Sequence, residues 1–378
     1  MTQMTLMKQM TRYDLALIGF GGVNRALAEL IAERGDELSE ELGFALRVVA
    51  ITDLRAGSLV RTDGIDLAPL LAAAPGELDF SGMAGGSADP RNEWVIREVP
   101  ADIVAEATFT NPADGEPALS HVRWALRAGK HVCTTNKGPV ALHGHALKRL
   151  AAEHGVSFEF EGTVLSGTPV LRTADRLLAG ARVTGVEGIM NGTSNYILGR
   201  LEEGVDFSDA VKEAQDAGYA EADPTADVEG FDVQLKVAIL AHEVLGATLS
   251  CDEVAREGIS RLTPADMRDA AARGLRWKLI GSVTRREDGS VDARVAPVAL
   301  PLEHPLASVG GPVNAVAFHT DLLGTVTVSG PGAGRTETAY ALLSDIIAIH
   351  QRHGTGPAAA AAAPAVPAGR VLQEAFRD

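Results

Sequence analysis

Cysteine and long apolar runs are scarce in this chain of 378 residues. The two cysteines, Cys133 and Cys251, form no Cys-x-x-Cys motif, so we expect no disulfide framework and a reducing, cytoplasmic location. No apolar run reaches the roughly 18 residues that a transmembrane helix needs. The N-terminus also lacks the apolar segment of a secretory signal. We therefore expect neither a membrane span nor a secretory signal.

Positive charge is scarce as well. The formal net charge is −16, which makes nucleic acid an improbable partner because phosphate binding needs basic patches. Only seven of the 34 basic residues are lysines. Lysine, unlike arginine, can lose its proton near neutral pH when its surroundings favour this. A lysine at a candidate site is therefore of particular interest.

Strands and helices alternate in the first part of the chain. An apolar strand at 13–19 runs into a glycine turn and a helix, and the pattern repeats to about residue 136. This alternation predicts an α/β fold with a doubly wound, mostly parallel sheet of the Rossmann type. The further elements expected in this part are strands at 46–51, 101–108 and 130–136 and a helix at 118–129.

The pattern changes after about residue 141. Helices and strands follow one another without regular alternation, which predicts an α+β domain with its own sheet. Its later strands are expected at 279–284, 292–300, 313–319 and 324–329. A glycine turn and a long helix follow at 330–352. The tail at 353–378 is rich in alanine and proline and is expected to be disordered.

Residues 19–24, GFGGVN, join the first strand to the first helix. Glycines at such a turn let backbone N–H groups approach a pyrophosphate at the helix N-terminus. Asn24 occupies the third fingerprint position, where close helix–strand packing favours glycine or alanine. Asp53 ends the second strand and would accept the ribose hydroxyl of NAD, whereas Arg55 could hold the 2′-phosphate of NADP. The alternative is a purely structural turn.

The segment 218–236 carries five acids followed by Lys236. Asp232 and Lys236 are spaced i, i+4 and share one face of a helix that is apolar nearly all round. A buried amine and carboxylate are costly unless they have a function. Glu221 and Asp227 belong to the same acidic run. The alternatives are a capped helix start with an ion pair, or a divalent metal site.

Lys137 follows the strand expected at 130–136. Ligands in open α/β sheets bind at the carboxyl ends of the strands, so Lys137 is a second candidate. The alternative is a surface lysine in a turn. His143 and His145 are expected to be solvated rather than metal ligands.

Several of these motifs resemble the homoserine dehydrogenase family over about residues 13–350. The residues that carry the resemblance are GFGGVN (19–24), TTNKGP (134–139), FEGTVLSGTPVL (160–171), GIMNGTSNYIL (188–198), AQDAGYAEADPTADVEGFDVQLK (214–236) and GPGAG (330–334).

The resemblance implies reversible NAD- or NADP-dependent reduction of L-aspartate 4-semialdehyde to L-homoserine, in threonine and methionine biosynthesis. It implies a dinucleotide-binding domain at 1–140 and a substrate-binding, dimerising domain at 141–325. A helix within 326–352 returns to the first domain. Two alternatives are a related dehydrogenase of another amino alcohol or hydroxy acid, and a dinucleotide sensor without activity. A threonine-binding regulatory domain is not expected.

The family pattern also assigns roles to residues. Lys236 resembles the proton donor and Lys137 the second active-site lysine, which also approaches the cofactor. The substrate-binding positions are Glu221, Asp227, Asp232, Gly192 and Thr193. The cofactor-binding positions are Gly19, Phe20, Gly21, Gly22, Val23, Asn24, Asp53, Arg55, Thr108 and Gly334. A loop that can hold a monovalent cation corresponds to Glu161, Val164, Ser166 and Thr168.

Overall fold

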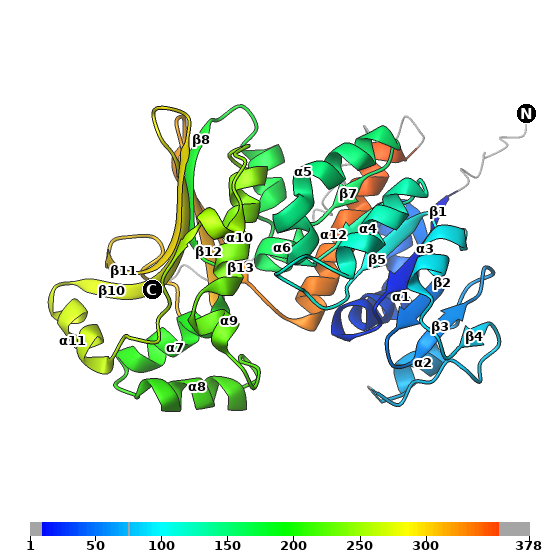
Figure 1. The fold of residues 1–378 in the computed structure, drawn as a ribbon, viewed down its shortest axis with the longest axis horizontal. Coiled ribbons are helices and arrows are strands. Elements are labelled where there is room, and N and C mark those ends of the chain that lie inside the picture. The colour runs from blue at the N-terminus through cyan, green and yellow to red at the C-terminus, as the bar shows by residue number, and fades with distance from the viewer. Residues whose placement is uncertain (1–9, 75, 355–378) are drawn as a thin grey trace, which may run out of the picture.

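The computed structural model describes residues 10–74 and 76–354, which form two sheets with helices packed on them (Figure 1). Most of the alanine- and proline-rich tail expected to be disordered lies outside the described residues. None of the described helices combines the length and the apolar character that a membrane crossing requires.

The first sheet has seven strands in the order β4-β3-β2-β1-β5-β6-β7. All neighbouring pairs are parallel except β2–β3 and β3–β4. Strands β2 to β4 lie on one side of β1, and β5 to β7 lie on the other. The strand order therefore reverses between β1 and β5. The bounds are β1 Thr11–Ile18, β2 Phe44–Asp53, β3 Gly57–Val60, β4 Gly86–Ser87, β5 Ile103–Glu106, β6 His131–Thr134 and β7 Phe158–Glu159.

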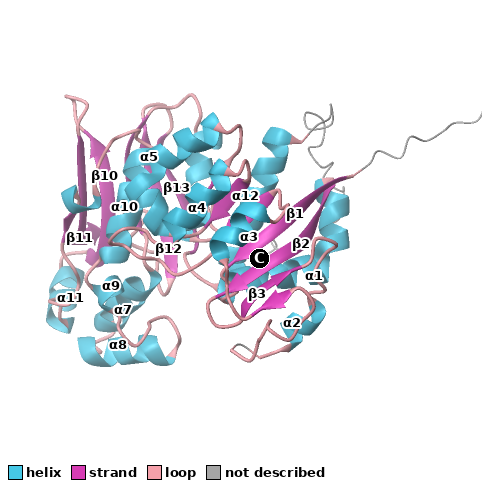
Figure 2. Cartoon of the chain, turned by 45° about the vertical axis from the view of Figure 1, so that its right-hand side comes forward, coloured by secondary structure: helices cyan, strands magenta, loops and turns pink. Residues whose placement is uncertain are grey.

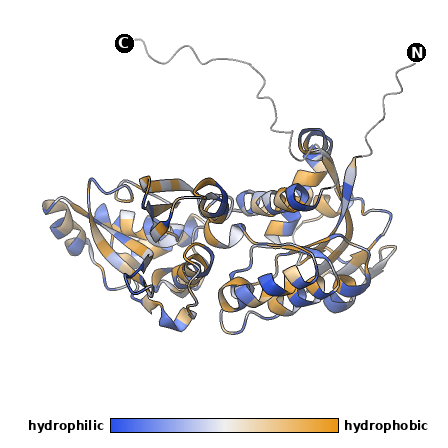
Figure 3. Cartoon of the chain, turned by 90° about the horizontal axis from the view of Figure 1, so that it is seen from above, coloured by the Kyte–Doolittle hydropathy of each residue, from blue (hydrophilic) through white to orange (hydrophobic). Residues whose placement is uncertain are grey.

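Alternating side chains of β1 face opposite helical layers. Leu15 and Leu17 pack in one apolar cluster with α1 (Gly22–Leu42) and α12 (Arg335–His353). Ala16 and Ile18 face the other layer, which contains α3 (Asn92–Glu98), α4 (Ala118–Arg127) and α5 (Lys137–Glu153). In Figure 3 apolar and polar residues are interspersed along the helices, as expected of helices that bury one face. The short helix α2 spans Ala68–Ala72.

The second sheet has six strands in the order β13-β12-β8-β10-β11-β9, and all pairs except β11–β9 are antiparallel. Helices α7, α10 and α11 pack on it (Figure 2). The strands are β8 Val183–Ile189, β9 Ala255–Arg256, β10 Leu275–Arg285, β11 Val291–Pro301, β12 Val313–Thr320 and β13 Gly324–Pro331. The remaining helices are α6 Gly162–Leu165, α7 Gly192–Glu202, α8 Phe207–Asp216, α9 Thr225–Val228, α10 Phe231–Glu243 and α11 Pro264–Ala272.

The predicted fold class is confirmed: a Rossmann-like, parallel-rich sheet is combined with a second sheet. The first sheet unit also contains one strand beyond the boundary expected at residue 140. Strand β7 is its edge strand, and α12 packs against α1 and β6. Helices α5 and α10 pack against each other where the two units meet, and one apolar cluster runs through both.

Candidate active site

The glycine turn after β1 passes close to the segment that follows β5, and at Gly19 there is no room for a side chain. Gly19 has φ of +82°, and a Cβ there would lie 2.9 Å from the carbonyl oxygen of Ala107. Gly21 is the N-cap of α1, which begins at Gly22. The turn therefore presents backbone N–H groups and a helix N-terminus at the edge where the strand order reverses, an arrangement suited to a pyrophosphate.

Asn24 occupies the third fingerprint position without disturbing the turn. Its side chain is fully buried, and Nδ2 lies 3.1 Å from the carbonyl oxygen of Ile18, 2.9 Å from that of Gly19 and 3.0 Å from that of Ala105. The amide thus ties α1 to both β1 and β5. Hydrogen bonds here replace the close packing that a small residue would give.

Asp53 and Arg55 lie at the end of β2. Oδ1 of Asp53 accepts hydrogen bonds from the backbone N–H groups of Arg55, at 2.8 Å, and Ala56, at 3.1 Å. The side chain of Arg55 is exposed. The carboxylate is thereby oriented at the edge where a ribose would bind.

Lys236 lies on α10 and is only 5% exposed. Its Nζ donates a hydrogen bond to the carbonyl oxygen of Met190 at 2.6 Å and lies 2.8 Å from Oδ2 of Asp232. The other oxygen of Asp232 lies 3.3 Å from Nζ of Lys137, the first residue of α5. The structure therefore brings three predicted site residues together, with the carboxylate between the two ammonium groups.

Burial and charge act in opposite directions on this cluster. Burial lowers the pKa of Lys236, and the charge of Lys137 adds to this, although Asp232 opposes it. Burial alone would raise the pKa of Asp232, but the two lysines outweigh it and lower that pKa. Burial raises the pKa of Asp227, and the charge of Asp232 adds to the effect. Lys236 is thus an ammonium group that releases its proton more readily than an exposed lysine.

Asn191 is a site residue that the sequence interpretation missed. Its Nδ2 lies 2.7 Å from Oδ1 of Asp227 and 3.1 Å from Oδ2 of Asp232. Its Oδ1 accepts a hydrogen bond from the backbone N–H of Ser194 and so caps α7. An asparagine just before a helix is a recognisable N-cap signal, but the contact with the acids depends on the tertiary fold.

The other predicted substrate-binding residues lie near this cluster, with different degrees of contact. A Cβ at Gly192 would lie 2.6 Å from the carbonyl oxygen of Pro312. The Thr193 hydroxyl donates to the carbonyl oxygen of Tyr219 at 2.5 Å, which anchors the loop after α8. Glu221 lies exposed in that loop. None of the contacts found among the described residues joins its side chain to Asp227 or Asp232.

A cavity of about 230 Å³ opens between the two units. Its wall combines both lysines with the short helix α6, the adjoining Ser166 and the glycine-rich loop before α12. Arg335, the first residue of α12, reaches the carbonyl oxygen of Gly22 at 3.4 Å, so the two glycine loops adjoin. The lining residues are Thr135, Lys137, Gly162, Thr163, Val164, Ser166, Lys236, Gly332, Ala333, Gly334 and Thr338.

In the segment expected to hold a cation, the side chains of Glu161, Ser166 and Thr168 form hydrogen bonds within the protein. The Glu161 carboxylate accepts hydrogen bonds from three consecutive backbone N–H groups, at 170–172, at 2.6 to 2.9 Å. Ser166 contacts the Thr338 hydroxyl, and Thr168 donates to the carbonyl oxygen of Pro331. Among the described residues, no group of three or more His, Cys, Asp or Glu side chains could hold a metal ion.

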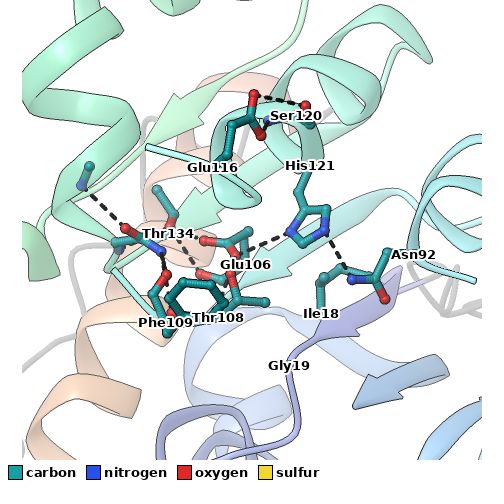
Figure 4. Close-up of polar contacts among 12 residues, drawn as sticks. Ile18, Gly19, Asn92, Glu106, Thr108, Phe109, Glu116, Ser120, His121 and Thr134 are labelled. Carbon is teal, nitrogen blue, oxygen red and sulfur yellow. Dashed lines mark hydrogen bonds and ion pairs between the residues drawn. The ribbon is translucent and has the colours of Figure 1, made fainter. Parts of the chain in front are cut away.

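Thr108 follows β5 but does not line the cavity. Its backbone N–H and its hydroxyl both donate to Glu106, the last residue of β5 (Figure 4). Glu106 also contacts His121 on α4, and neither residue was singled out from the sequence. The signal available for Glu106 was an acid placed after the apolar run Ile103–Ala105 in the segment 101–108.

Comparisons with known proteins agree with one another. The family model described as homoserine dehydrogenase matches residues 169–347. An NAD(+)-dependent homoserine dehydrogenase of Pseudomonas canavaninivorans is 58% identical over 342 residues, which cover 90% of this chain and 97% of that protein.

Solved structures show the same similarity. The putative homoserine dehydrogenase of Archaeoglobus fulgidus is 37% identical with a TM-score of 0.79, and the match covers 89% of this chain and 99% of that one. A hyperthermophilic archaeal homoserine dehydrogenase in complex with NADPH is 30% identical with a TM-score of 0.76, over 90% and 98% of the two chains.

Proposed function

The chain belongs to the homoserine dehydrogenase family, and on this premise we propose that Lys236 and Lys137 carry out its reaction in the cavity between the two units. The enzyme is an NAD(P)-dependent oxidoreductase that acts on a CH–OH group. It interconverts L-aspartate 4-semialdehyde and L-homoserine, a step of amino-acid biosynthesis. The observation that carries the residue roles is the contact of both lysines with Asp232.

Lys236 is the proposed proton donor. When bound, the nicotinamide cofactor supplies the hydride for reduction of the aldehyde. The carbonyl oxygen then gains negative charge, which a nearby ammonium group stabilises before transferring a proton to it. Asp232 keeps Lys236 protonated, and burial makes the proton easier to release. In the direction of oxidation, neutral Lys236 accepts the hydroxyl proton.

The acids around Asn191 are the proposed substrate-binding groups. The α-ammonium of the substrate requires a carboxylate, and Asp227 and Asp232 lie within reach of one amide. Glu221 is exposed in the preceding loop and would have to turn toward the cavity when substrate binds. Gly192 and Thr193 shape the backbone beside these acids.

The cofactor site is proposed to run from the turn at 19–24 past Thr108 to Gly334. The close approach at Gly19, where a Cβ would meet the next strand, fits a bound pyrophosphate. We propose a preference for NAD, because the oriented carboxylate of Asp53 would repel a 2′-phosphate. The relative at 58% identity is named as NAD(+)-dependent, which supports this preference. Arg55 is the residue that could oppose it.

Four further expectations remain proposals. The first is the division into a dinucleotide unit at 1–140, a substrate unit at 141–325 and a returning helix within 326–352. The second is a homodimer formed through the second sheet, and the third is a cytoplasmic location. The fourth is a monovalent cation held by backbone carbonyls of Glu161, Val164, Ser166 and Thr168.

The direct test is oxidation of L-homoserine by the purified chain with NAD and with NADP in turn, followed by the absorbance of the reduced nicotinamide. We expect turnover with both the substrate and NAD present and a lower kcat/KM with NADP. Folded protein that turns over neither cofactor with homoserine would contradict the proposal. A panel of other amino alcohols and hydroxy acids tests whether homoserine is the preferred substrate.

A further inference from the structure

A buried acid at the end of β5 has no role in the chemistry proposed above. Glu106 is 0% exposed. Its carboxylate accepts hydrogen bonds from the backbone N–H of Thr108 at 3.0 Å and from the Thr108 hydroxyl (Figure 4). The Thr134 hydroxyl lies 3.0 Å from the carboxylate and 2.9 Å from the backbone carbonyl oxygen of Glu106. Nδ1 of His121 lies 3.4 Å away. A buried carboxylate is unfavourable unless donors surround it, and here the donors come from three different segments.

The position of Glu106 in the sheet is where a dinucleotide is expected to bind. Strand β5 lies beside β1, and the strand order reverses between these two strands. Ala107, the next residue, is the one that Gly19 approaches so closely. Glu106 therefore lies at the base of the crevice where ligands of such folds bind.

The network of Glu106 leads directly to Lys137. Thr134 accepts a hydrogen bond from the backbone N–H of Asn136 at 3.0 Å. The Asn136 amide donates to the carbonyl oxygens of Thr108, at 3.2 Å, and Phe109, at 3.0 Å. Its oxygen accepts from the backbone N–H of Gly138. Lys137 is thus held between two residues that both belong to the network.

His121 orients the carboxylate from the other side. It is 2% exposed, and the Asn92 amide nitrogen lies 2.9 Å from its Nε2. With the Asn92 amide on Nε2, the ring nitrogen that faces Glu106 is Nδ1.

We propose that Glu106, oriented by His121, is a positioning residue: its charged carboxylate fixes the two strand-end segments that carry Thr108 and Lys137, and so sets the place of Lys137 beside Asp232. This role rests on the proposed function. A neutral acceptor of the same shape would fill the space but would hold the donors less strongly, because hydrogen bonds to charged groups are roughly twice as strong.

The test compares variants that keep shape with variants that remove the interaction. Glu106→Gln keeps the size and removes the charge, and Thr134→Val removes the hydroxyl link toward Asn136. His121→Leu removes the donor, whereas His121→Asn restores an amide donor near the position of Nδ1. Ser120→Ala is the matched control, since Ser120 precedes His121 on α4 but contacts Glu116 instead (Figure 4).

We expect kcat with homoserine to fall about tenfold or more in Glu106→Gln and His121→Leu, with the KM for homoserine changed less than twofold. Thr134→Val should show a smaller loss of the same kind, and His121→Asn should recover most of the activity. Ser120→Ala should match the wild type. Rates are given per folded protein, with the melting temperature measured alongside.

Wild-type kcat and KM in folded Glu106→Gln and Thr134→Val would overturn the inference. A lowered melting temperature with unchanged kinetics would also overturn it, because that pattern belongs to a structural role only. An inactive wild type would instead contradict the proposed function, so the two failures are distinguishable.

Discussion

Lys236 and Lys137 both approach Asp232, but their surroundings differ. The Lys236 side chain is 7% exposed and that of Lys137 is 25% exposed. Only the more buried lysine has a carbonyl oxygen, that of Met190, as an additional acceptor. This difference suits Lys236, rather than Lys137, to proton transfer.

The role of Lys236 predicts the effect of removing its amine. Lys236→Met should lower kcat by about 10²- to 10⁴-fold, the usual contribution of general acid catalysis, with a smaller change in the KM for homoserine. Steady-state kinetics in both directions measure this. Lys148→Met is the control, because Lys148 forms an ion pair with Glu243 at 2.7 Å and is 49% exposed. A variant that lost only affinity would show that Lys236 is not the acid.

Removing the charge of Asp232 should change the pH profile of kcat. Its charge raises the pKa of Lys236, so in Asp232→Asn that pKa should fall further. Reduction of the aldehyde needs protonated Lys236, and the alkaline limb of the kcat profile should therefore move to lower pH. Asp227→Asn should move it less, since the influence of Asp227 on Lys236 is weaker. An alkaline limb that stayed in place in Asp232→Asn would show that this limb does not report the pKa of Lys236.

Sequence reasoning at this scale found neighbours along one helix and missed contacts between elements. The i, i+4 spacing was enough to pair Asp232 with Lys236. Lys137 could be assigned only to a sheet edge, because its contact with Asp232 depends on how α5 packs on α10. Asn191, Glu106 and His121 act through partners 15 to 41 residues away in the chain, which no local pattern reveals.

At the scale of elements, helix α5 shows how a boundary was misjudged. The interpretation placed Lys137 directly after the strand expected at 130–136, with a turn as the alternative. The helix begins at Lys137 instead, and Asn136 caps it by accepting from the backbone N–H of Gly138 at 3.2 Å. Gly138 and Pro139 suggest a loop, although proline is well tolerated in the first turn of a helix.

Helix α12 is fastened to the segment beside the cavity through an arginine and two buried acids. Arg172 lies 2.8 Å from Oδ1 of Asp345 and 3.4 Å from Glu161. The backbone N–H of Glu161 also donates to Asp345. Asp345 is 0% exposed, and burial raises its pKa well above the usual value of 3.8.

The raised pKa of Asp345 predicts how stability varies with pH. Between the unfolded and the folded pKa, the native state binds more protons than the unfolded state, so the free energy of unfolding falls as pH rises. Asp345→Asn cannot release a proton, and its melting temperature should therefore decline less than that of the wild type as pH rises above the usual carboxyl pKa. Exposed Asp175→Asn should follow the wild type. If the melting temperatures of Asp345→Asn and the wild type declined equally with pH, this linkage would be contradicted.

At the scale of the whole molecule, one apolar cluster joins residues of both sheet units. Val316 of β12 and Val104 of β5 belong to it, together with much of α10. The two units are therefore packed on each other rather than linked by an open hinge. Composition and alternation predicted two sheets, but the shared core depends on long-range packing that the sequence pattern does not specify.

The proposed dimer predicts an effect of charge on the second sheet. Thr327 on β13 is exposed and pairs in register with Ala317. Thr327→Arg should shift the protein from dimer to monomer, because an arginine would bury its charge between two such sheets. Size-exclusion chromatography with light scattering measures this. Ser81→Arg, at an exposed site of the other unit, should stay dimeric. A wild type that is monomeric would refute the dimer itself.

The return of α12 to the first sheet also has a consequence for synthesis of the chain. Ala339, Leu342, Leu343 and Ile346 of α12 share an apolar cluster with Leu15 and Leu17 of β1. Between β7, which completes that sheet, and the start of α12 lie some 175 residues. At about 5–20 residues per second the ribosome needs on the order of ten seconds to make them. During that time part of the apolar face of β1 is uncovered on the nascent chain, and the first unit reaches its final packing only when the last helix emerges.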